Sequence, residues 1–422
     1  MKKPFSLVLG TNVWTHLQVP LAEAFTDILG AEHFRMAVFH GLDEERRTLG
    51  WEERRSLPWV AGPPSDERER EALWKLCMDA DVMVFGACPD ELLKARALAG
   101  KLTLVQAERM LKKPYHALRM MNPRYARGIR RFRGMVNHPN VHALTIGYHA
   151  PEDLHQMGAY GSRVWRWGYF VDVNPEKPAP AGDRPVRIMW AGRMIDWKKV
   201  DVLLRAVSRI QHEPWFGSLN VIGDGAERAK LEALARRLSL DEGKVTIEHA
   251  IPFAEIRTRM RASDLYVLPS NRHEGWGAVT GEAMSEGCVV VANETAGSAR
   301  ELVTDRETGY LFRDGDAAHL ASVIAHAARA YEERMEIRQR AWERMHALWH
   351  PRVAAERLVE LALGLLGHAP MPIYESGPCC HAASSGHQSS SSKGPHLLTG
   401  KGRMQDTRDG FRRTPIFQLS AK

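Results

Sequence analysis

Two glutamates with seven residues between them, Glu274 and Glu282, carry the strongest chemical signal in the sequence. Glu274 precedes a glycine-rich loop at 275–277, and Glu282 lies in the helix expected after that loop. Such a loop leaves backbone N–H groups free and the helix dipole adds positive potential, so the place suits a phosphate. Ionised glutamate only accepts hydrogen bonds, which suits hydroxyl groups. Phosphate and hydroxyls together indicate a nucleotide sugar as the ligand.

Two apolar runs, at 265–268 and 289–291, flank this pair of glutamates. Both runs have the length of buried strands, and Gly287 is expected to end the helix between them. The stretch therefore predicts strand, loop, helix and strand, which is a βαβ unit. Its loop opens at the carboxyl end of a parallel strand, where open α/β sheets place ligands.

Cations occupy a second strand-end loop. Gly192 and Arg193 follow the strand expected at 186–191, and Lys198 and Lys199 come before the next helix. Cations in this place match a diphosphate, because they offset the charge that grows as a glycosidic bond to phosphate breaks. The alternative interpretation is a solvated basic loop.

The acidic pair, with the small-residue turn and the Val-rich strand after it, resembles the signature of the family-4 glycosyltransferases, which are retaining enzymes of the GT-B fold. That family has Gly-Arg followed by Lys five positions after the Arg, as at Arg193 and Lys198. The next residue is commonly Gly in the family and is Lys199 here. The resemblance covers 187–312. Near the N-terminus, residues 10–16 stand in place of the family's Gly-rich loop.

The resemblance implies a hexosyl-type glycosyltransferase that moves a sugar from a nucleotide-sugar donor to a hydroxyl of a glycan or lipid-linked acceptor. It implies retention of anomeric configuration, with no bound metal and no other cofactor. Arg193 and Lys198 would then stabilise the leaving diphosphate, as a divalent ion does elsewhere. Glu274 would bind a hydroxyl of the transferred sugar, and Glu282 would bind the ribose hydroxyls. The leaving phosphate would itself take the acceptor proton, so no side-chain base is expected.

By the same resemblance, backbone groups would make most of the other donor contacts. The backbone of Trp276 and Gly277 would hold the sugar, and that of Val279 and Thr280 would hold the phosphate. Trp276 is equally well interpreted as a core residue, as aromatics usually are.

Further contacts are expected where strands end. Gly223 begins a Gly-Asp-Gly turn, which suits nucleotide contact and a plain turn equally well, and Ile251 follows the strand at 245–248. In the first half, Glu108 and Arg109 end a strand and would face the cleft, in contact with the sugar or the acceptor. A structural role is the alternative for Glu108.

Strands alternate with helical periods in both halves of the 422 residues. This pattern predicts an α/β protein with two doubly wound, Rossmann-like parallel sheets, which face a cleft in the GT-B arrangement. The expected parts are an acceptor-side domain at 1–173, a nucleotide-sugar-binding domain at 186–350, a helix at 351–368 that crosses back to the first domain, and a disordered tail at 369–422.

Positive charge is concentrated at 108–133, which holds nine Lys or Arg and one acid, a net charge of +8. One interpretation is contact of Lys112–Arg133 with an anionic membrane or a lipid-diphosphate acceptor, at about 1 kcal/mol per cation. A solvated helix and loop is the other. Nucleic acid fits less well, because base-stacking aromatics are not interleaved with the cations.

The sequence shows no window of about twenty apolar residues, no signal-peptide pattern and no metal-ligand spacing among its five cysteines. We therefore expect a cytoplasmic protein, and peripheral contact with the inner face of the membrane follows only from the first interpretation of the basic segment. Two other functions stay open: a GT-B nucleotide-sugar epimerase, which would turn over donor without acceptor, and a non-catalytic GT-B protein that binds a nucleotide or a partner. The intact acidic pair and the cations argue against the second of these.

Overall fold

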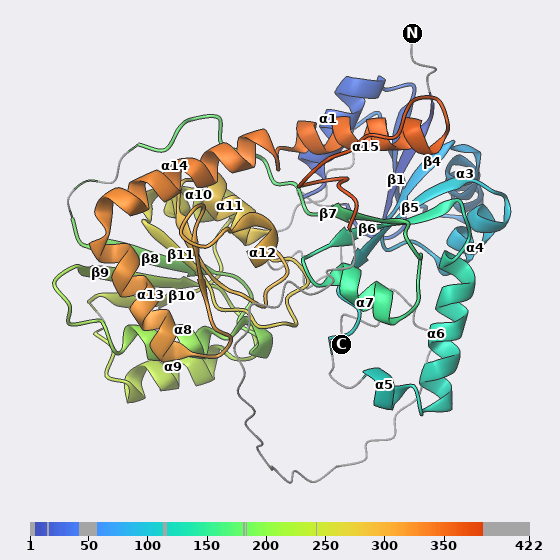
Figure 1. The fold of residues 1–422 in the computed structure, drawn as a ribbon. Helices are drawn as coiled ribbons and strands as arrows, with labels where there is room; N and C mark the ends of the chain where they lie inside the picture. The colour runs from blue at the N-terminus through green and yellow to red at the C-terminus, as the bar shows by residue number, and fades with distance from the viewer. Residues whose placement is uncertain are drawn as a thin grey trace.

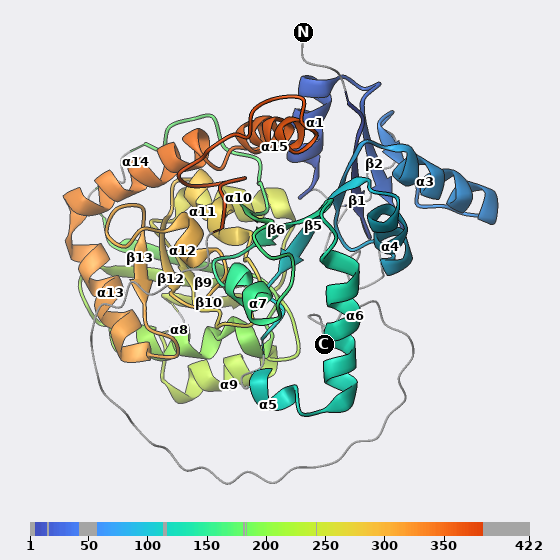
Figure 2. The same cartoon turned by 45° about the vertical axis from the view of Figure 1, so that its right-hand side comes forward.

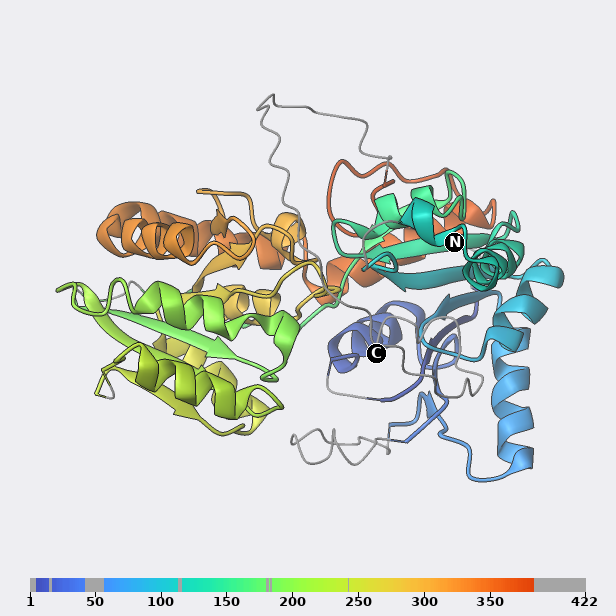
Figure 3. The same cartoon turned by 90° about the horizontal axis from the view of Figure 1, so that it is seen from below.

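The computed structural model describes residues 5–14, 17–41, 57–112, 116–179, 182, 184–241 and 243–382. These residues form two α/β domains, each built on a parallel sheet, which lie side by side (Figures 1 and 3). No helix in the described ranges is long and apolar enough to cross a membrane.

The first domain has a seven-stranded sheet in the order β3-β2-β1-β4-β5-β6-β7, with every pair parallel. The strands β1, β4 and β6 are buried along their whole length, which is typical of a parallel sheet covered on both faces. The strands are β1 Leu7–Thr11, β2 Phe34–Val38, β3 Val60–Ala61, β4 Val82–Phe85, β5 Leu102–Glu108, β6 Val141–Ile146 and β7 Val164–Trp167. The helices are α1 Val19–Leu29, α3 Glu67–Asp79, α4 Asp90–Leu98, α5 His116–Arg119, α6 Pro123–Val136 and α7 Ala150–Gln156.

The second domain has a six-stranded parallel sheet in the order β10-β9-β8-β11-β12-β13. Its strands are β8 Val186–Ala191, β9 Phe216–Ile222, β10 Val245–Glu248, β11 Leu265–Leu268, β12 Val289–Asn293 and β13 Tyr310–Phe312. A 3-10 turn, η1 Asp196–Lys198, is followed by α8 Val200–Val207, α9 Arg228–Arg237, α10 Phe253–Ala262, α11 Val279–Ser285, α12 Ala299–Leu302, α13 Ala317–Arg329 and α14 Tyr331–Ala347. The three-residue strand β13 is too short to be distinguished in the sequence.

Two consecutive helices join the domains. After α14, the helix α15 (Pro351–Leu365) packs against α1 of the first domain, and Figure 1 shows the pair running along one side of the molecule from one domain to the other. The inward face of α15, which includes Leu358 and Leu361, is fully buried. The chain thus begins and ends its described part on the same domain.

The expectation of disorder from residue 369 onward is wrong for 369–382. His381 forms an antiparallel bridge with Trp165 of the edge strand β7, and the Ala382 N–H donates to the Val164 carbonyl at 2.9 Å. Cys379 and Cys380 are buried there. The segment satisfies backbone groups that an edge strand would otherwise leave unpaired. The rest of the predicted tail, 383–422, lies outside the described residues.

The second sheet depends on a close approach between two strand-end glycines. The Gly192 N–H donates to the Ile222 carbonyl at 3.0 Å, and Gly223 has φ of 148°. A Cβ atom on Gly223 would lie 1.9 Å from the Gly192 carbonyl oxygen, so that contact admits only glycine.

We expect Gly223→Ala to lower the free energy of unfolding of the second domain by about 1–3 kcal/mol, because the backbone must move to admit the methyl group. Urea denaturation followed by tryptophan fluorescence measures the change. Gly128→Ala is the matched control: a Cβ on Gly128, in α6, meets no atom within 4 Å, and stability there should stay the same or rise by about 0.5–1 kcal/mol. Equal effects of the two substitutions would contradict this packing argument.

Candidate functional site

The loop after β8 carries the predicted cations. Arg193 is exposed, and Lys198 ends the short turn η1. Lys199 has φ 49° and ψ 39°, in the left-handed region, and its Nζ lies 2.8 Å from the Asp196 carboxylate. A left-handed lysine costs about 1–2 kcal/mol, which glycine avoids. Glycine would adopt this conformation without that cost, and the ion pair with Asp196 accompanies it here.

Lys198 joins this loop to the loop after β11. Its Nζ lies 2.6 Å from Oε2 of Glu274, and only 16% and 12% of the two side chains are exposed. Burial alone would raise the pKa of Glu274, but the charge and hydrogen bond of Lys198 outweigh it, and the pKa lies below its ordinary value. Glu274 is therefore an ionised, hydrogen-bond-accepting group held in place by a cation.

Glu282 lies in α11 and is only 6% exposed. Burial raises the pKa of Glu282 to about 7, while the nearby charges of Arg257 and Lys198 oppose that rise. No hydrogen bond or ion pair of its carboxylate is found within the described ranges. Lys198 therefore acts on both glutamates, and Glu282 is a buried carboxyl whose oxygens are suited to hydroxyl donors.

The Gly-Asp-Gly turn binds the neighbouring loops together. The Asp224 carboxylate accepts the Ala250 N–H at 2.8 Å and lies 2.8 Å from Nδ1 of His249. The Asp224 carbonyl accepts the Met194 N–H at 2.7 Å. These hydrogen bonds hold together the loops that follow β8, β9 and β10, at the carboxyl ends of the strands of the second sheet. The loops contain Gly192, Gly223 and Ile251, and Ile251 is half-buried against the core.

Of the residues after Glu274, Trp276 is a core side chain. It is 1% exposed, its ring centroid lies 5.4 Å from that of Trp349, and a Cβ on Gly168 would lie 2.7 Å from it. Only its backbone is left for ligand contact. The side chain of Thr280 is also buried, with Oγ1 2.8 Å from Oγ of Ser298, and its N–H donates to the Gly277 carbonyl at 3.0 Å. Phosphate contact by the backbone of Val279 and Thr280 stays a prediction.

The first domain contacts the Glu274 loop directly. A Cβ on Gly275 would lie 2.3 Å from Oε2 of Glu108, and a Cβ on Gly147 would lie 2.4 Å from the Gly275 carbonyl oxygen. From the second domain itself, a Cβ on Gly297 would lie 1.7 Å from the same oxygen. Tyr169 donates its hydroxyl hydrogen bond to Glu108. Glu108 therefore positions the loop, whereas a sugar contact by Glu108 stays a prediction. Gly147 was not predicted from the sequence, where its one signal is a glycine directly after a strand.

Arg109, the other first-domain candidate, turns toward α7. Its Nε lies 3.7 Å from Oδ2 of Asp153, and 14% of its side chain is exposed. Arg272, which the sequence analysis did not select, donates from Nη2 to the Leu111 carbonyl at 3.2 Å and so connects the Glu274 loop to the same region. Arg272 contacts Leu111, which is far away in the sequence, and no motif around Arg272 predicts this contact.

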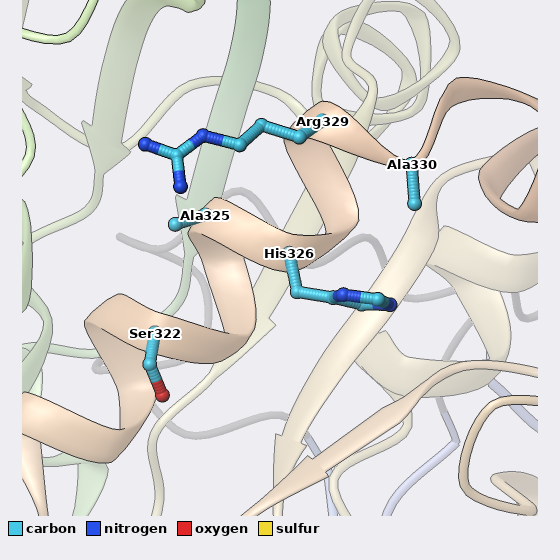
Figure 4. A pocket seen from close by; sticks show the side chains of 5 residues that line it. All are labelled: Ser322, Ala325, His326, Arg329 and Ala330. Carbon is cyan, nitrogen blue, oxygen red and sulfur yellow. The ribbon is translucent and has the colours of Figure 1, made fainter.

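Two surface hollows lie outside this constellation. One of about 470 Å³ lies on α13 and is lined by Ser322, Ala325, His326, Arg329 and Ala330 (Figure 4). Another of about 240 Å³ lies between α8 and α9 and includes Ile195, Asp196 and Lys199 from the cationic loop. Neither hollow is lined by Glu274 or Glu282. The evidence for the site is therefore the contact between the loops that follow β8 and β11.

Comparison with known proteins shows that the second domain is similar to a family of enzymes. Residues 185–329 match the family model of the glycosyl transferases group 1. The chain is 31% identical over 193 residues to a GDP-mannose-dependent alpha-(1-6)-phosphatidylinositol monomannoside mannosyltransferase of Mycolicibacterium smegmatis, covering 43% of this chain and 49% of that protein. It is 30% identical over 177 residues to a GDP-mannose-dependent alpha-mannosyltransferase of Mycobacterium tuberculosis, covering 39% and 42%. The chain thus spans about half the length of these relatives, or less.

A solved structure extends the comparison to both domains. HepE of Anabaena, crystallised with UDP, has a TM-score of 0.61 and 18% identity over 84% of this chain and 98% of that one. At that identity the likeness concerns the fold, and it confirms the predicted pair of parallel-sheet domains. Residues 185–329 are therefore similar to the glycosyl transferases group 1, and the chain has the two-domain GT-B fold.

Proposed function

We propose that the chain is a retaining, metal-independent glycosyltransferase of family 4, which transfers a hexosyl group from a nucleotide-sugar donor to a glycan or lipid-linked acceptor. The 2.6 Å contact between Lys198 and Glu274 supports this most directly, because it joins the predicted diphosphate loop to the predicted sugar-binding loop. Glu282 lies close enough to feel the charge of Lys198.

In this proposal the donor lies along the carboxyl edge of the second sheet. Glu282 binds the ribose hydroxyls, the backbone of Val279 and Thr280 binds phosphate, and Glu274 binds a hydroxyl of the sugar. The bond between the anomeric carbon and the phosphate oxygen breaks, and Arg193 and Lys198 offset the charge left on the diphosphate. The acceptor oxygen bonds to the same face of that carbon, and its proton passes to the leaving phosphate.

The relatives suggest which donors to test first. Two are named as GDP-mannose-dependent mannosyltransferases, and the HepE crystal holds UDP. The Rhizobium leguminosarum relative is named as a lipopolysaccharide core biosynthesis mannosyltransferase. We therefore propose a role in polysaccharide or glycolipid synthesis, with GDP-mannose and UDP-glucose as the first donors to be assayed.

We further propose that α6 contacts an anionic membrane. Its buried face includes Ile129 and Phe132, while its five arginines (Arg124, Arg127, Arg130, Arg131 and Arg133) are all exposed. Leu118 and Met121, just before the helix, are 63% and 79% exposed. A basic face next to exposed apolar side chains is the pattern of a surface that lies on anionic lipid. Figure 2 shows α6 extending downward from the first domain, with α5 beyond its lower end.

Arg193→Ala should lower kcat/KM about two-hundredfold, because the loss of one charge at the leaving diphosphate removes about 3 kcal/mol of transition-state stabilisation. A sugar-transfer assay with GDP-mannose or UDP-glucose measures it, with a donor-only incubation to detect epimerisation. Arg236→Ala, on the exposed side of α9, is the matched control and should leave the rate unchanged. A loss of less than threefold in folded Arg193→Ala protein would remove this residue from the proposed mechanism.

Glu282→Gln should stabilise the folded chain and weaken nucleotide binding. The pKa of the Glu282 carboxyl is 4.5 in the unfolded chain and about 7 in the folded chain, so folding makes its ionisation less favourable. The free energy of unfolding therefore decreases as the pH rises from 4.5 to 7. The variant should therefore gain up to about 3 kcal/mol in free energy of unfolding at pH 8 and nothing below pH 4.5. Denaturation at several pH values measures this.

The control for that variant is Glu356→Gln, at an exposed position of α15, which should change stability by less than about 0.5 kcal/mol at every pH. Nucleotide affinity of the unmodified chain should rise as pH increases through 7, since the ionised carboxylate accepts the ribose hydroxyls. If the free energy of unfolding depends on pH in the same way for the unmodified chain and for Glu282→Gln, the Glu282 carboxyl is not a buried group directed at a ligand.

Replacement of Arg127, Arg130 and Arg131 by Gln should weaken binding to phosphatidylglycerol vesicles roughly a hundredfold, at about 1 kcal/mol per cation. Vesicle co-sedimentation measures the partition, and neutral phosphatidylcholine vesicles should bind neither protein. These arginines are exposed, so the fold should tolerate the change.

The matched control replaces three exposed arginines of the second domain by Gln: Arg209, Arg236 and Arg237. It removes the same net charge from another face. If both triple variants lose vesicle binding equally, net charge rather than α6 is responsible, and the proposed membrane surface is wrong.

A further inference from the structure

The guanidinium of Arg228, at the start of α9, lies between the ends of two strands. Its Nη1 donates to the carbonyl of Gly223, just after β9, at 2.8 Å and to the carbonyl of Glu248, the last residue of β10, at 2.9 Å. Its Nη2 donates to the Ile247 carbonyl at 3.2 Å, and its Nε lies 2.8 Å from the Glu232 carboxylate. Lysine could not replace these contacts, because its ammonium is a single point and lacks the planar fork of arginine.

Asp224 extends this arrangement to the loop after β10. Its Oδ1 lies 3.2 Å from Nη1 of Arg228 and 2.8 Å from Nδ1 of His249, and its Oδ2 accepts the Ala250 N–H at 2.8 Å. The hydrogen bond from Ala250 lowers the pKa of Asp224 most, and the neighbouring His249 and Arg228 lower it further against the effect of burial. Arg228 and the ionised Asp224 therefore hold residues 247–250 by their carbonyl and N–H groups together.

The next residue of this loop, Ile251, has backbone groups left for a ligand. Its side chain is half-buried against the core, which fixes the residue in place. Neither its N–H nor its carbonyl has a hydrogen-bond partner among the residues that the structure describes. A donor and an acceptor side by side match the edge of a nucleobase, which also presents donors and acceptors next to one another.

This loop lies next to the proposed ribose position. The charge of Arg257, in α10, acts on Glu282, and Ile251 comes just before α10. The proposed diphosphate loop follows β8, and its Met194 N–H donates to the Asp224 carbonyl at 2.7 Å. Asp224 is thus bonded to the diphosphate loop through its backbone and to the loop of Ile251 through its side chain.

We propose that Arg228 and Asp224 are positioning residues that determine which nucleobase the chain accepts, by fixing the backbone of Ile251; this inference rests on the proposed function. Neither side chain has to touch the base. A purine is wider than a pyrimidine, so a donor and an acceptor held at one place relative to the diphosphate favour one class of base over the other. A loop that is already held in place binds more tightly, because less conformational freedom is lost on binding.

The test measures the affinity of the full chain for UDP, GDP, ADP and inorganic pyrophosphate by calorimetry at constant ionic strength. Arg228→Lys should weaken binding of the preferred nucleotide about tenfold or more, the loss of two hydrogen bonds to the base, and should bring the nucleotide affinities closer together. Pyrophosphate affinity should change less than about twofold, because the backbone hydrogen bond between Met194 and Asp224 is unaltered. Arg236→Lys, exposed on the same helix, is the matched control and should bind all four as the unmodified chain does.

A second variant, Asp224→Asn, guards against loss of folding in Arg228→Lys, which removes hydrogen bonds in a largely buried place. The side chain of Asp224 is 37% exposed, so the fold should tolerate the change. One amide oxygen can accept the Ala250 N–H, but the amide nitrogen donates and cannot accept from Arg228. This variant should therefore show the same separation between nucleotide and pyrophosphate affinities.

Equal losses for nucleotides and pyrophosphate in the folded variants would show that Arg228 is only part of the scaffold and would overturn the inference. Unchanged ratios among the nucleotide affinities, or an unmodified chain that binds none of the three nucleotides, would overturn it as well. Failure of the proposed function looks different: a nucleotide binds and its affinity depends on Arg228 and Asp224, but no sugar is transferred from the matching nucleotide sugar.

Discussion

The ion pair between Lys198 and Glu274 is the interaction on which the account of this molecule depends. It connects the loop after β8 to the loop after β11, and both side chains are largely buried. A buried ion pair is weak as a source of stability, because desolvation opposes the attraction between the charges. Its retention is better explained by what it positions: a cation that also affects Glu282, and an ionised carboxylate at the carboxyl edge of a parallel sheet.

The first domain meets the site through close backbone contact, and the ion pair between Arg166 of β7 and Glu301 of α12 joins the two domains beside it. Gly147 and Gly297 approach Gly275 so closely that a side chain on either would collide with it, and Glu108 packs against the same glycine. The Tyr148 N–H donates to the Gly297 carbonyl at 3.0 Å. These contacts fix the loop of Glu274 against the ends of β5 and β6. The position of Glu274 therefore depends on how the two domains meet.

Many elements of the second domain could be predicted because short stretches of its sequence indicate where strands and helices begin and end. The strands at 186–191 and 265–268 are uninterrupted apolar runs, and Gly287 ends α11 with a φ of 81°. The segment 369–382 was assigned to a disordered tail because its composition is that of a tail. Its order comes from pairing with β7, more than two hundred residues earlier, and no local pattern encodes that.

The same distinction applies to the site. Glu274, Glu282 and Lys198 could be selected because their types and spacing lie within short motifs. Arg272 could not, since its significance arises from a hydrogen bond to a residue 161 positions away. For Trp276 the motif suggested a contact of its backbone with the sugar, and its side chain was equally well interpreted as a core residue. Its packing against Trp349 shows that the side chain belongs to the core, and the backbone contact stays a prediction.

The most direct test of the central claim is the affinity of the folded chain for UDP and GDP, measured by calorimetry with and without Lys198→Met. If Lys198 contacts the donor diphosphate while holding Glu274, the substitution should weaken binding of the nucleotide that the chain prefers by about tenfold or more. An unchanged affinity in a folded variant would show that the ion pair is only a structural link between two loops, and the donor site would have to be sought elsewhere.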